Sequence, residues 1–363
     1  MLTAIFIIIV FFVVVIVHEL GHFLAAKKVG IRVEEFGFGL PPRLLKKKIG
    51  ETVYSLNALP IGGFVKLHGE DDGEDLSLTG KKIDPERAFF GKPKWQRALV
   101  LVAGVLMNFL LGVLVISFIF TRGVMVPTDR IHIEKVVEKA PAAAAGLESD
   151  DIILTIDGRE IKKGEDIIGY TSERLGEELT LKIKRGETTK EVKITPRKDY
   201  PSGEGPMGVV ISSFEEKKYP LWQAPIFGIW EALKLSGLIA VSFGQIIWQL
   251  ISSGTVPEGM AGPVGIAQIT SEAVKFGPLA VLELMGLISI NLVVVNILPL
   301  PALDGGRLFF IGVEAITGRR VKPKFERVAH QAGFAFLIFL LALLTYNDLL
   351  RINIWEKIKS IFP

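Results

Sequence analysis

The stretch His18-Glu19-Leu20-Gly21-His22 decides how the rest of this chain is interpreted. It closes a run in which every residue from Leu2 to Val17 except Thr3 is apolar. In a helix, two histidines four residues apart lie on one face with the glutamate beside them. That spacing lets both imidazoles bind one zinc ion while the carboxylate reaches a water on the metal. Because polar side chains are costly to bury in a membrane segment, the motif favours a functional metal site over a pair of interfacial histidines.

The composition is typical of a membrane protein. Hydrophobic residues make up 49% of the 363 residues, and the mean hydropathy is +0.42, so several spans are expected. The formal net charge of +3 is too small to indicate nucleic-acid binding. The chain has no cysteine, which excludes disulfides, cysteine zinc ligands and a cysteine nucleophile.

Four apolar segments are long enough to cross a bilayer, and a fifth is ambiguous. The four expected spans are residues 2–26, 98–120, 279–298 and 329–346. Residues 235–251 are nearly as apolar, but Gln245 and Gln249 recur four apart. An amphipathic helix on the membrane surface therefore fits that segment as well as a fifth span.

Two parts of the chain have the pattern of β structure. Residues 127–197 are mixed and charged, with strand-like segments separated by turn signals, and predict a compact β-rich domain. In the loop after the first span, Thr52–Leu67 reads as two short strands around a Pro-Ile-Gly-Gly turn. A β-hairpin is therefore expected within Thr52–Leu67.

The distribution of basic residues predicts the orientation. The loop from Lys27 to Arg97 contains fourteen Lys and Arg residues, so the positive-inside rule makes it cytoplasmic. The first span then runs inward, the histidines lie towards its cytoplasmic end, and the β-rich domain lies outside. If residues 235–251 lie on the outer surface, the third span and the basic cluster Arg319–Arg327 also end on the cytoplasmic side. A fifth span would move both to the wrong side, so four spans are predicted.

A catalytic zinc site usually keeps three protein ligands, so the histidine pair needs a partner. The predicted topology puts Asp304 at the depth of the pair, after a proline-containing segment and before two glycines. A carboxylate on a broken helix end in lipid needs a cation, although a helix cap at the interface is the simpler alternative. The remaining histidines do not share this depth convincingly: His68, His132 and His330.

The second span contains one asparagine among small residues. Gly104, Asn108 and Gly112 are spaced four apart, and small residues at that spacing let helices pack closely. Asn108 is therefore expected to face protein, either through a packing hydrogen bond or as part of the site.

Together these motifs resemble the site-2 protease family of intramembrane zinc metalloproteases, in particular the bacterial branch that cuts anti-sigma factors. The resemblance rests on four motifs in this order: His18-Glu19-x-x-His22, Ala103-Gly104 with Asn108-Phe109, Gly262-Pro263-Val264-Gly265-Ile266-Ala267, and Asn296-x-x-Pro299-x-Pro301-x-Leu303-Asp304-Gly305. Residues 133–156 are similar to the PDZ core of these proteases, with Asp150 where a glycine is usual. The chain has room for one such domain.

The resemblance implies that His18, His22 and Asp304 bind one Zn²⁺ and that Glu19 is the general base. It also implies that the β-hairpin pairs with an unwound substrate strand. The residues predicted to contact the substrate are Asn296, Asn108, Gly62, Gly63 and Phe64.

The expected protein is a polytopic α-helical membrane protein with four transmembrane helices, a membrane-associated β-hairpin and one extracytoplasmic PDZ-like domain. The expected domains are residues 1–121 with the zinc motif, 122–215 as the PDZ-like domain, 216–278 as a membrane-surface connector, and 279–363 with the third ligand. Its predicted location is the bacterial inner membrane, with the active site towards the cytoplasm and the bilayer as a partner. Single-span membrane proteins are the predicted substrates, either anti-sigma factors or remnant signal peptides.

Two other functions remain open. A zinc transporter would need further carboxylates or histidines along a path through the membrane, and the spans offer few. A non-catalytic PDZ scaffold would not need Glu19.

Overall fold

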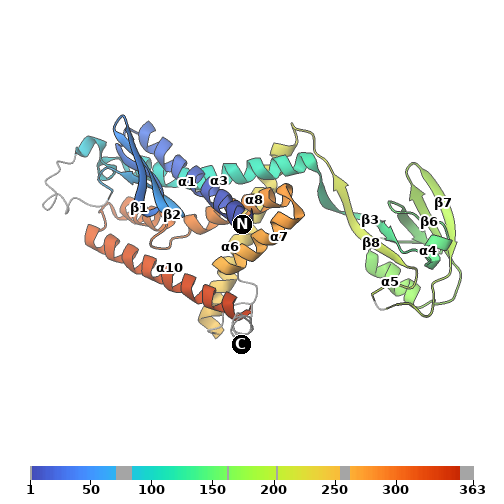
Figure 1. Cartoon of the computed structure of the whole chain (residues 1–363). Helices are drawn as coiled ribbons and strands as arrows, with labels where there is room; N and C mark the ends of the chain where they lie inside the picture. The colour runs from blue at the N-terminus through green and yellow to red at the C-terminus, as the bar shows by residue number, and fades with distance from the viewer. Residues whose placement is uncertain (1, 71–83, 162, 202, 254–261, 352–363) are drawn as a thin grey trace. The chain divides into compact units, whose positions relative to one another are not determined.

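The computed structural model describes residues 2–70, 84–161, 163–201, 203–253 and 262–351 (Figure 1). The chain divides into two compact units. One comprises residues 1–119 and 222–363 and is mainly helical, and the other comprises residues 120–221 and is rich in β structure.

The helical unit is built from long apolar helices and shorter connecting ones. In chain order these are α1 (Leu2–Lys28), α3 (Lys94–Arg122), α6 (Ala224–Ser253), α7 (Pro263–Phe276), α8 (Pro278–Ile297), α9 (Asp304–Thr317) and α10 (Pro323–Arg351). Two 3₁₀ turns, η1 (Pro85–Arg87) and η2 (Phe89–Gly91), precede α3. Helices α7 and α9 were not predicted from the sequence.

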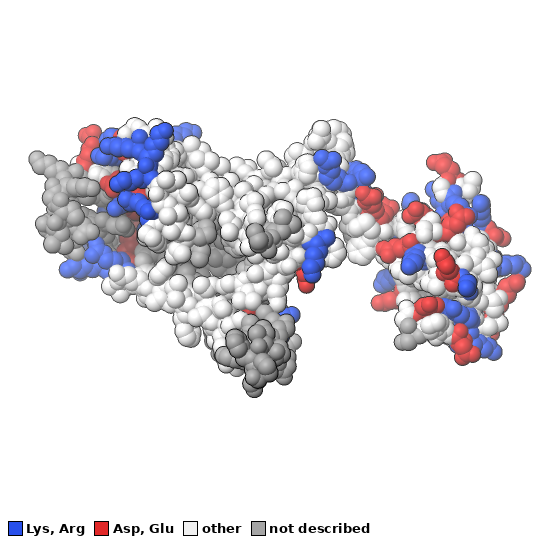
Figure 2. Space-filling view, viewed as in Figure 1, with Lys and Arg blue, Asp and Glu red and all other residues white. Residues whose placement is uncertain are grey.

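Five helices in the described part of the chain are long and apolar enough to cross a membrane. Four of them overlap the predicted spans: Thr3–Lys28, Lys94–Arg122, Pro278–Ile297 and Lys324–Arg351. The fifth, Ala224–Gln249, overlaps the ambiguous segment, so the count of four and the orientation stay predictions. On the face of this unit seen in Figure 2, uncharged residues cover the middle, and Lys and Arg gather over the end that carries β1 (Val33–Ile49) and β2 (Thr52–Leu67).

Small residues let α1, α3 and α8 approach one another closely. A Cβ atom on Gly21 would lie 2.3 Å from the backbone oxygen of Ala103, so α1 and α3 cross almost backbone to backbone. A Cβ atom on Gly112 would lie 2.4 Å from the Ile290 side chain of α8. The Ser289 hydroxyl donates to the backbone oxygen of Asn108 at 2.9 Å. The spacing of small residues in the second span thus marks its packed face.

The β element of the helical unit differs from the prediction. Thr52–Leu67 is one strand, β2, and the tight turn lies before it at Gly50, where φ is +62°. The Pro-Ile-Gly-Gly segment bends β2, with φ of +76° at Gly62, but its two halves do not pair with each other. Both halves pair instead with Glu35–Phe38 of β1, one on each side. The predicted hairpin within Thr52–Leu67 is therefore wrong, because the local pattern could not show that β1 would come between the two halves.

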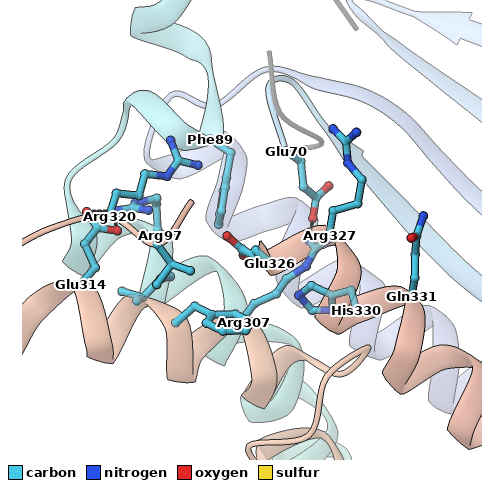
Figure 3. A pocket seen from close by; sticks show the side chains of 13 residues that line it. Glu70, Phe89, Arg97, Arg307, Glu314, Arg320, Glu326, Arg327, His330 and Gln331 are labelled. Carbon is cyan, nitrogen blue, oxygen red and sulfur yellow. Dashed lines mark hydrogen bonds and ion pairs between the residues drawn. The ribbon is translucent and has the colours of Figure 1, made fainter. Parts of the chain in front are cut away.

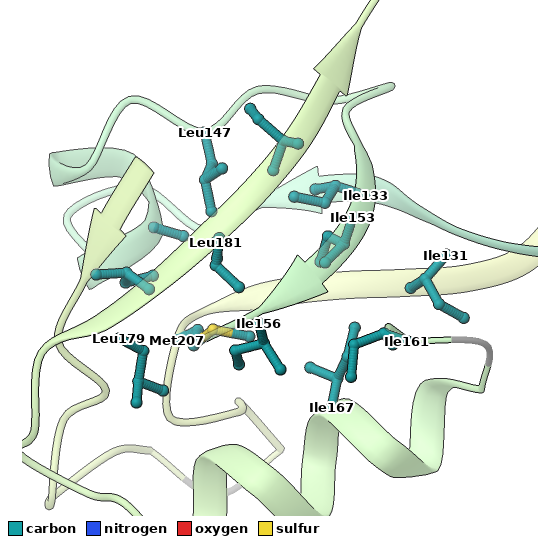
Figure 4. Packing of buried hydrophobic residues seen from close by; sticks show 13 residues of the cluster. Ile131, Ile133, Leu147, Ile153, Ile156, Ile161, Ile167, Leu179, Leu181 and Met207 are labelled. Atoms are coloured by element: carbon teal, nitrogen blue, oxygen red, sulfur yellow. The ribbon is translucent and has the colours of Figure 1, made fainter. Parts of the chain in front are cut away.

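The β-rich unit contains one sheet. Its strands lie in the order β7-β6-β4-β3-β8, and β5 pairs with β4. The strands and helices are β3 (Val124–Val136), α4 (Pro141–Ala144), β4 (Ile152–Ile156), β5 (Arg159–Glu160), α5 (Gly164–Ser172), β6 (Leu179–Arg185), β7 (Thr188–Ile194) and β8 (Val209–Lys217). Figure 4 shows the aliphatic core, in which Ile133, Ile153 and Leu181 are among the fully buried side chains.

The sequence interpretation missed β8. Its last three residues are Glu215, Glu216 and Lys217, which obscure the alternation of its apolar start. The strand forms because β3 offers it a long edge, from Val124 opposite Lys217 to Val136 opposite Val209. A partner about eighty residues away in the chain decides its structure, which is a common way for context to override local pattern.

An ion pair between Asp151 and Arg185 in the β-rich unit gives a first prediction. The Asp151 carboxylate is fully buried and accepts two hydrogen bonds from Arg185, at 2.7 and 2.8 Å, and one from the Glu148 amide at 2.9 Å. Burial alone would raise the pKa of Asp151, but these hydrogen bonds outweigh it, and its pKa lies below the usual value. Asp151→Asn is expected to lower the free energy of unfolding by about 2 kcal/mol at neutral pH, since it removes the two charge-assisted hydrogen bonds from Arg185, which keeps only the exposed Glu148 as a charge partner.

The pH dependence of that effect follows from the sign of the shift. A carboxyl group with a lowered pKa in the folded state stabilises the fold above its ordinary pKa of about 4 and loses that contribution as the pH falls. The difference between wild type and Asp151→Asn should therefore shrink below about pH 4. Denaturant unfolding of both proteins at pH 7 and pH 3 measures it, with the exposed neighbour Asp150→Asn as control. A difference that is independent of pH would contradict the assignment.

Candidate metal centre

The structure brings the three predicted zinc ligands together. His18 and His22 lie one turn apart in α1, and their Nε2 atoms are 3.1 Å from each other. Oδ2 of Asp304, the first residue of α9, lies 3.1 Å from His18 Nε2 and 3.3 Å from His22 Nε2. Two segments that are far apart in the sequence thus bring three potential ligand atoms within 3.3 Å of one another.

The geometry and chemistry of these atoms fit a zinc ion. With zinc–nitrogen bonds of about 2.0–2.1 Å, ligand atoms of a tetrahedral site lie about 3.3 Å apart, close to the distances found here. The Nδ1 atom of His22 lies 2.8 Å from the backbone oxygen of Val100. Because a carbonyl oxygen only accepts, His22 carries its proton on Nδ1 and turns the Nε2 lone pair towards Asp304. An imidazole lone pair and a carboxylate that face each other are both electron-pair donors, so a cation between them would stabilise the arrangement.

Helix α3 supports the histidine pair from the other side. A Cβ atom on Gly104 would lie 2.3 Å from Nε2 of His22 and 2.9 Å from Cε1 of His18. The backbone of α3 can approach the two rings only because residue 104 has no side chain. Val100 and Gly104 therefore position the pair without being ligands.

The segment before α9 positions Asp304. Helix α8 ends at Ile297, and the chain then runs through two prolines, which cannot continue a helix with its hydrogen bonds intact. Ala302 has a positive φ of +76°, and its amide donates to Nδ1 of His330 at 2.8 Å. His330 does not belong to the ligand cluster, but it holds the turn two residues before Asp304. The sequence interpretation missed this role, because it depends on a backbone contact that no motif records.

Glu19 lies in a cavity of about 280 Å³ beside the cluster. The Val65 backbone of β2 makes a hydrogen bond to the Glu19 carboxylate, so a strand amide holds that side chain. The cavity is lined by residues of α1, β2, α8 and the turn before α9: Val15, His18, Glu19, Gly62, Gly63, Leu292, Asn296, Ala302, Leu303 and Asp304.

Three of the five predicted substrate contacts line this cavity and two do not. Gly62, Gly63 and Asn296 line it, and Nδ2 of Asn296 lies 3.4 Å from His18 Nε2. Phe64 lies instead against Gly37, where a Cβ atom would come 2.4 Å from its ring. Asn108 is fully buried in α3, and its side chain makes no hydrogen bond within the described residues. The structure does not place Phe64 or Asn108 at the cavity.

Within the part of the chain that the structure describes, His18, His22 and Asp304 form the one group of three or more His, Asp or Glu side chains close enough to hold a metal ion.

Comparison with known proteins agrees with this site. The model of peptidase family M50 matches residues 6–340. The regulator of sigma-W protease RasP of Bacillus subtilis is 28% identical, with 96% of this chain and 99% of the relative covered. Zinc metalloprotease RasP of Geobacillus kaustophilus is 30% identical, with 94% and 96% covered, and that of Bacillus licheniformis is 29% identical, with 96% and 99% covered.

Among solved structures, the crystal structure of the PDZ domain of an SdrC-like protein from Listeria monocytogenes is 26% identical with a TM-score of 0.21, and the match covers 24% of this chain and 93% of that one. The family match spans nearly all of the sequence, including both segments of the metal cluster. The chain therefore belongs to peptidase family M50, the site-2 protease family, and is a membrane-embedded zinc metalloendopeptidase.

Proposed function

We propose that this protease hydrolyses a peptide bond within the transmembrane segment of single-span membrane proteins. The observation that carries the proposal is the place of the metal cluster, since His18, Glu19 and His22 lie in α1, an apolar helix of spanning length. His18, His22 and Asp304 would bind the zinc ion. A site built into such a helix acts on substrates that reach it from the membrane.

The proposed chemistry assigns a role to each side chain of the cavity. A zinc ion held by these ligands would make a bound water molecule more acidic and would polarise the scissile carbonyl. Glu19 takes the proton of the attacking water and passes it to the leaving amine. Asn296, beside His18, offers its amide donor to the substrate carbonyl.

A transmembrane helix must unwind before one of its peptide bonds can be cut. Unpaired backbone groups in lipid cost several kcal/mol each, so the unwound segment needs new partners. Strand β2 offers such partners, because Gly62 and Gly63 line the cavity and Gly63 lies directly beside Glu19. We propose that the substrate adds to β2 as an extra strand.

The orientation and the substrates are part of the same proposal. By the positive-inside rule, the basic loops support a cavity that faces the cytoplasm of a bacterial inner membrane and a β-rich domain outside, where a PDZ-like domain would bind or exclude substrate ectodomains. The name of the Bacillus subtilis relative refers to regulation of sigma-W. Anti-sigma factors are therefore the proposed substrates, with remnant signal peptides as the second class.

Mapping the cut bond tests this function. The full-length protein in lipid vesicles should cleave a single-span reporter within its transmembrane segment, in the half nearest the cytoplasm. Mass spectrometry of the two products locates the cut, and a chelator should stop cleavage until zinc is restored. His22→Ala serves as the inactive control. Cleavage only in the water-exposed parts of the reporter would refute an intramembrane reaction, and no cleavage of any reporter would favour a scaffold.

A further inference from the structure

A second cavity, of about 450 Å³, lies beside α9 and contains paired charges (Figure 3). Its lining includes Arg97 of α3, Glu314 and Arg307 of α9, and Glu70. Arg97 pairs with Glu314, and Arg307 pairs with Glu70. Burying charged side chains beside apolar helices is costly. The Arg97–Glu314 pair joins α3 to α9, which suggests a role in positioning these helices.

The Arg97–Glu314 pair is bidentate and almost completely buried. Nη2 of Arg97 lies 2.8 Å from each carboxylate oxygen of Glu314, and the two side chains are 7% and 14% exposed. Lys94, one turn earlier in α3, donates to the backbone oxygen of Glu314 at 3.0 Å. Two cations in the first turn of α3 thus bind the side chain and the backbone oxygen of Glu314 in the last turn of α9. A helix C-terminus is where a positive charge is favourable.

Helix α9 connects this pair to the metal cluster. Asp304 is its first residue and Glu314 lies ten residues later, about 15 Å along a helix. Ile311 of α9 packs in one apolar cluster with Val100 and Leu101 of α3. Apolar packing brings the helices together but allows them to slide, whereas a bidentate ion pair selects one register.

Helix α3 also positions the histidines. The Val100 carbonyl binds His22, and Gly104 lies against both rings. Arg97, Val100 and Gly104 occupy about two turns of one helix. The same stretch of α3 therefore fixes both parts of the metal cluster, the pair in α1 and the carboxylate in α9.

We propose that Arg97 and Glu314 are positioning residues that hold α9 at the register in which Asp304 meets His18 and His22. The inference rests on the proposed zinc site and adds to it the device that assembles the third ligand. A purely stabilising role is the alternative. Buried ion pairs are poor stabilisers, because desolvation offsets much of their attraction, so a gain in geometry explains this pair better.

The test measures zinc binding rather than activity. In full-length Glu314→Gln, zinc affinity from chelator competition should fall by about 10- to 100-fold, as is typical when a group that orients a ligand is lost. The visible spectrum of the Co²⁺-substituted protein should change as well, because Asp304 meets the metal differently. The matched control is Glu51→Gln, which breaks a pair with Arg87 in the same unit away from α9. It should leave affinity and spectrum unchanged.

Two further variants make each outcome decisive. If Glu314→Gln binds zinc like wild type while His22→Ala does not, the positioning role is refuted and the metal site stands. If His22→Ala also binds zinc like wild type, the metal site itself is refuted. Should Glu314→Gln fail to fold, Arg97→Lys keeps both charges but loses the planar fork. A folded Arg97→Lys protein with wild-type affinity and Co²⁺ spectrum would then overturn the proposal.

Discussion

Glu19→Gln is expected to lower the rate of reporter cleavage by about 100- to 10,000-fold, the usual contribution of a positioned general base. The amide would keep the size of the side chain, but it cannot accept a proton from water. Zinc content should be unchanged, because the ligand cluster consists of His18, His22 and Asp304 without Glu19. Loss of activity with full zinc occupancy separates a catalytic role from a binding role.

The measurement compares initial cleavage rates and zinc content for three variants. His22→Ala should lose both activity and zinc, and Glu51→Gln should lose neither, since Glu51 pairs with Lys27 and Arg87 and does not line the cavity. Cleavage by Glu19→Gln at the wild-type rate would remove Glu19 from the mechanism. It would also revive the scaffold hypothesis for this site, with the proteolysis due to another protein in the preparation.

The metal cluster was predictable because its ligands are encoded locally. The spacing of His18 and His22 puts both rings on one helix face. The prolines before Asp304 predict that the helix ends there. The distribution of basic residues predicted that both segments lie at the same depth in the membrane, and this prediction connected Asp304 to the histidine pair. The structure brings the three predicted ligand atoms close together, while their binding of zinc and the topology stay predictions.

The parts that the sequence did not predict depend on backbone contacts between distant segments. The two halves of β2 looked like a hairpin because strand propensity is local, yet each half pairs with β1. The contacts of the Val100 carbonyl with His22 and of the Ala302 amide with His330 could not be predicted either, since almost every residue has a backbone carbonyl and amide. Sequence patterns identify side chains that do chemistry better than the main-chain groups that orient them.

Gly104 offers the second large effect, from a residue that is neither a ligand nor a base. Gly104→Ala should strengthen α3 as a helix, because alanine is favoured over glycine by about 1 kcal/mol. Its Cβ atom, however, would lie 2.3 Å from the ligand atom of His22 and 2.9 Å from the His18 ring, so both rings must move or α1 must separate from α3. We expect zinc affinity to fall by about 10- to 100-fold or more, with cleavage falling alongside it.

Gly112→Ala is the matched control for this effect, two turns further along α3. There a new Cβ atom would meet the Ile290 side chain of α8, whereas at Gly104 it meets the imidazoles of the metal cluster. Chelator competition on both variants should show a large loss for Gly104→Ala and near wild-type affinity for Gly112→Ala. Equal affinities would mean that α3 does not set the position of the histidine rings. A selective loss at Gly104 would show that the close crossing of α1 and α3 is a requirement of the metal site, beyond its contribution to packing.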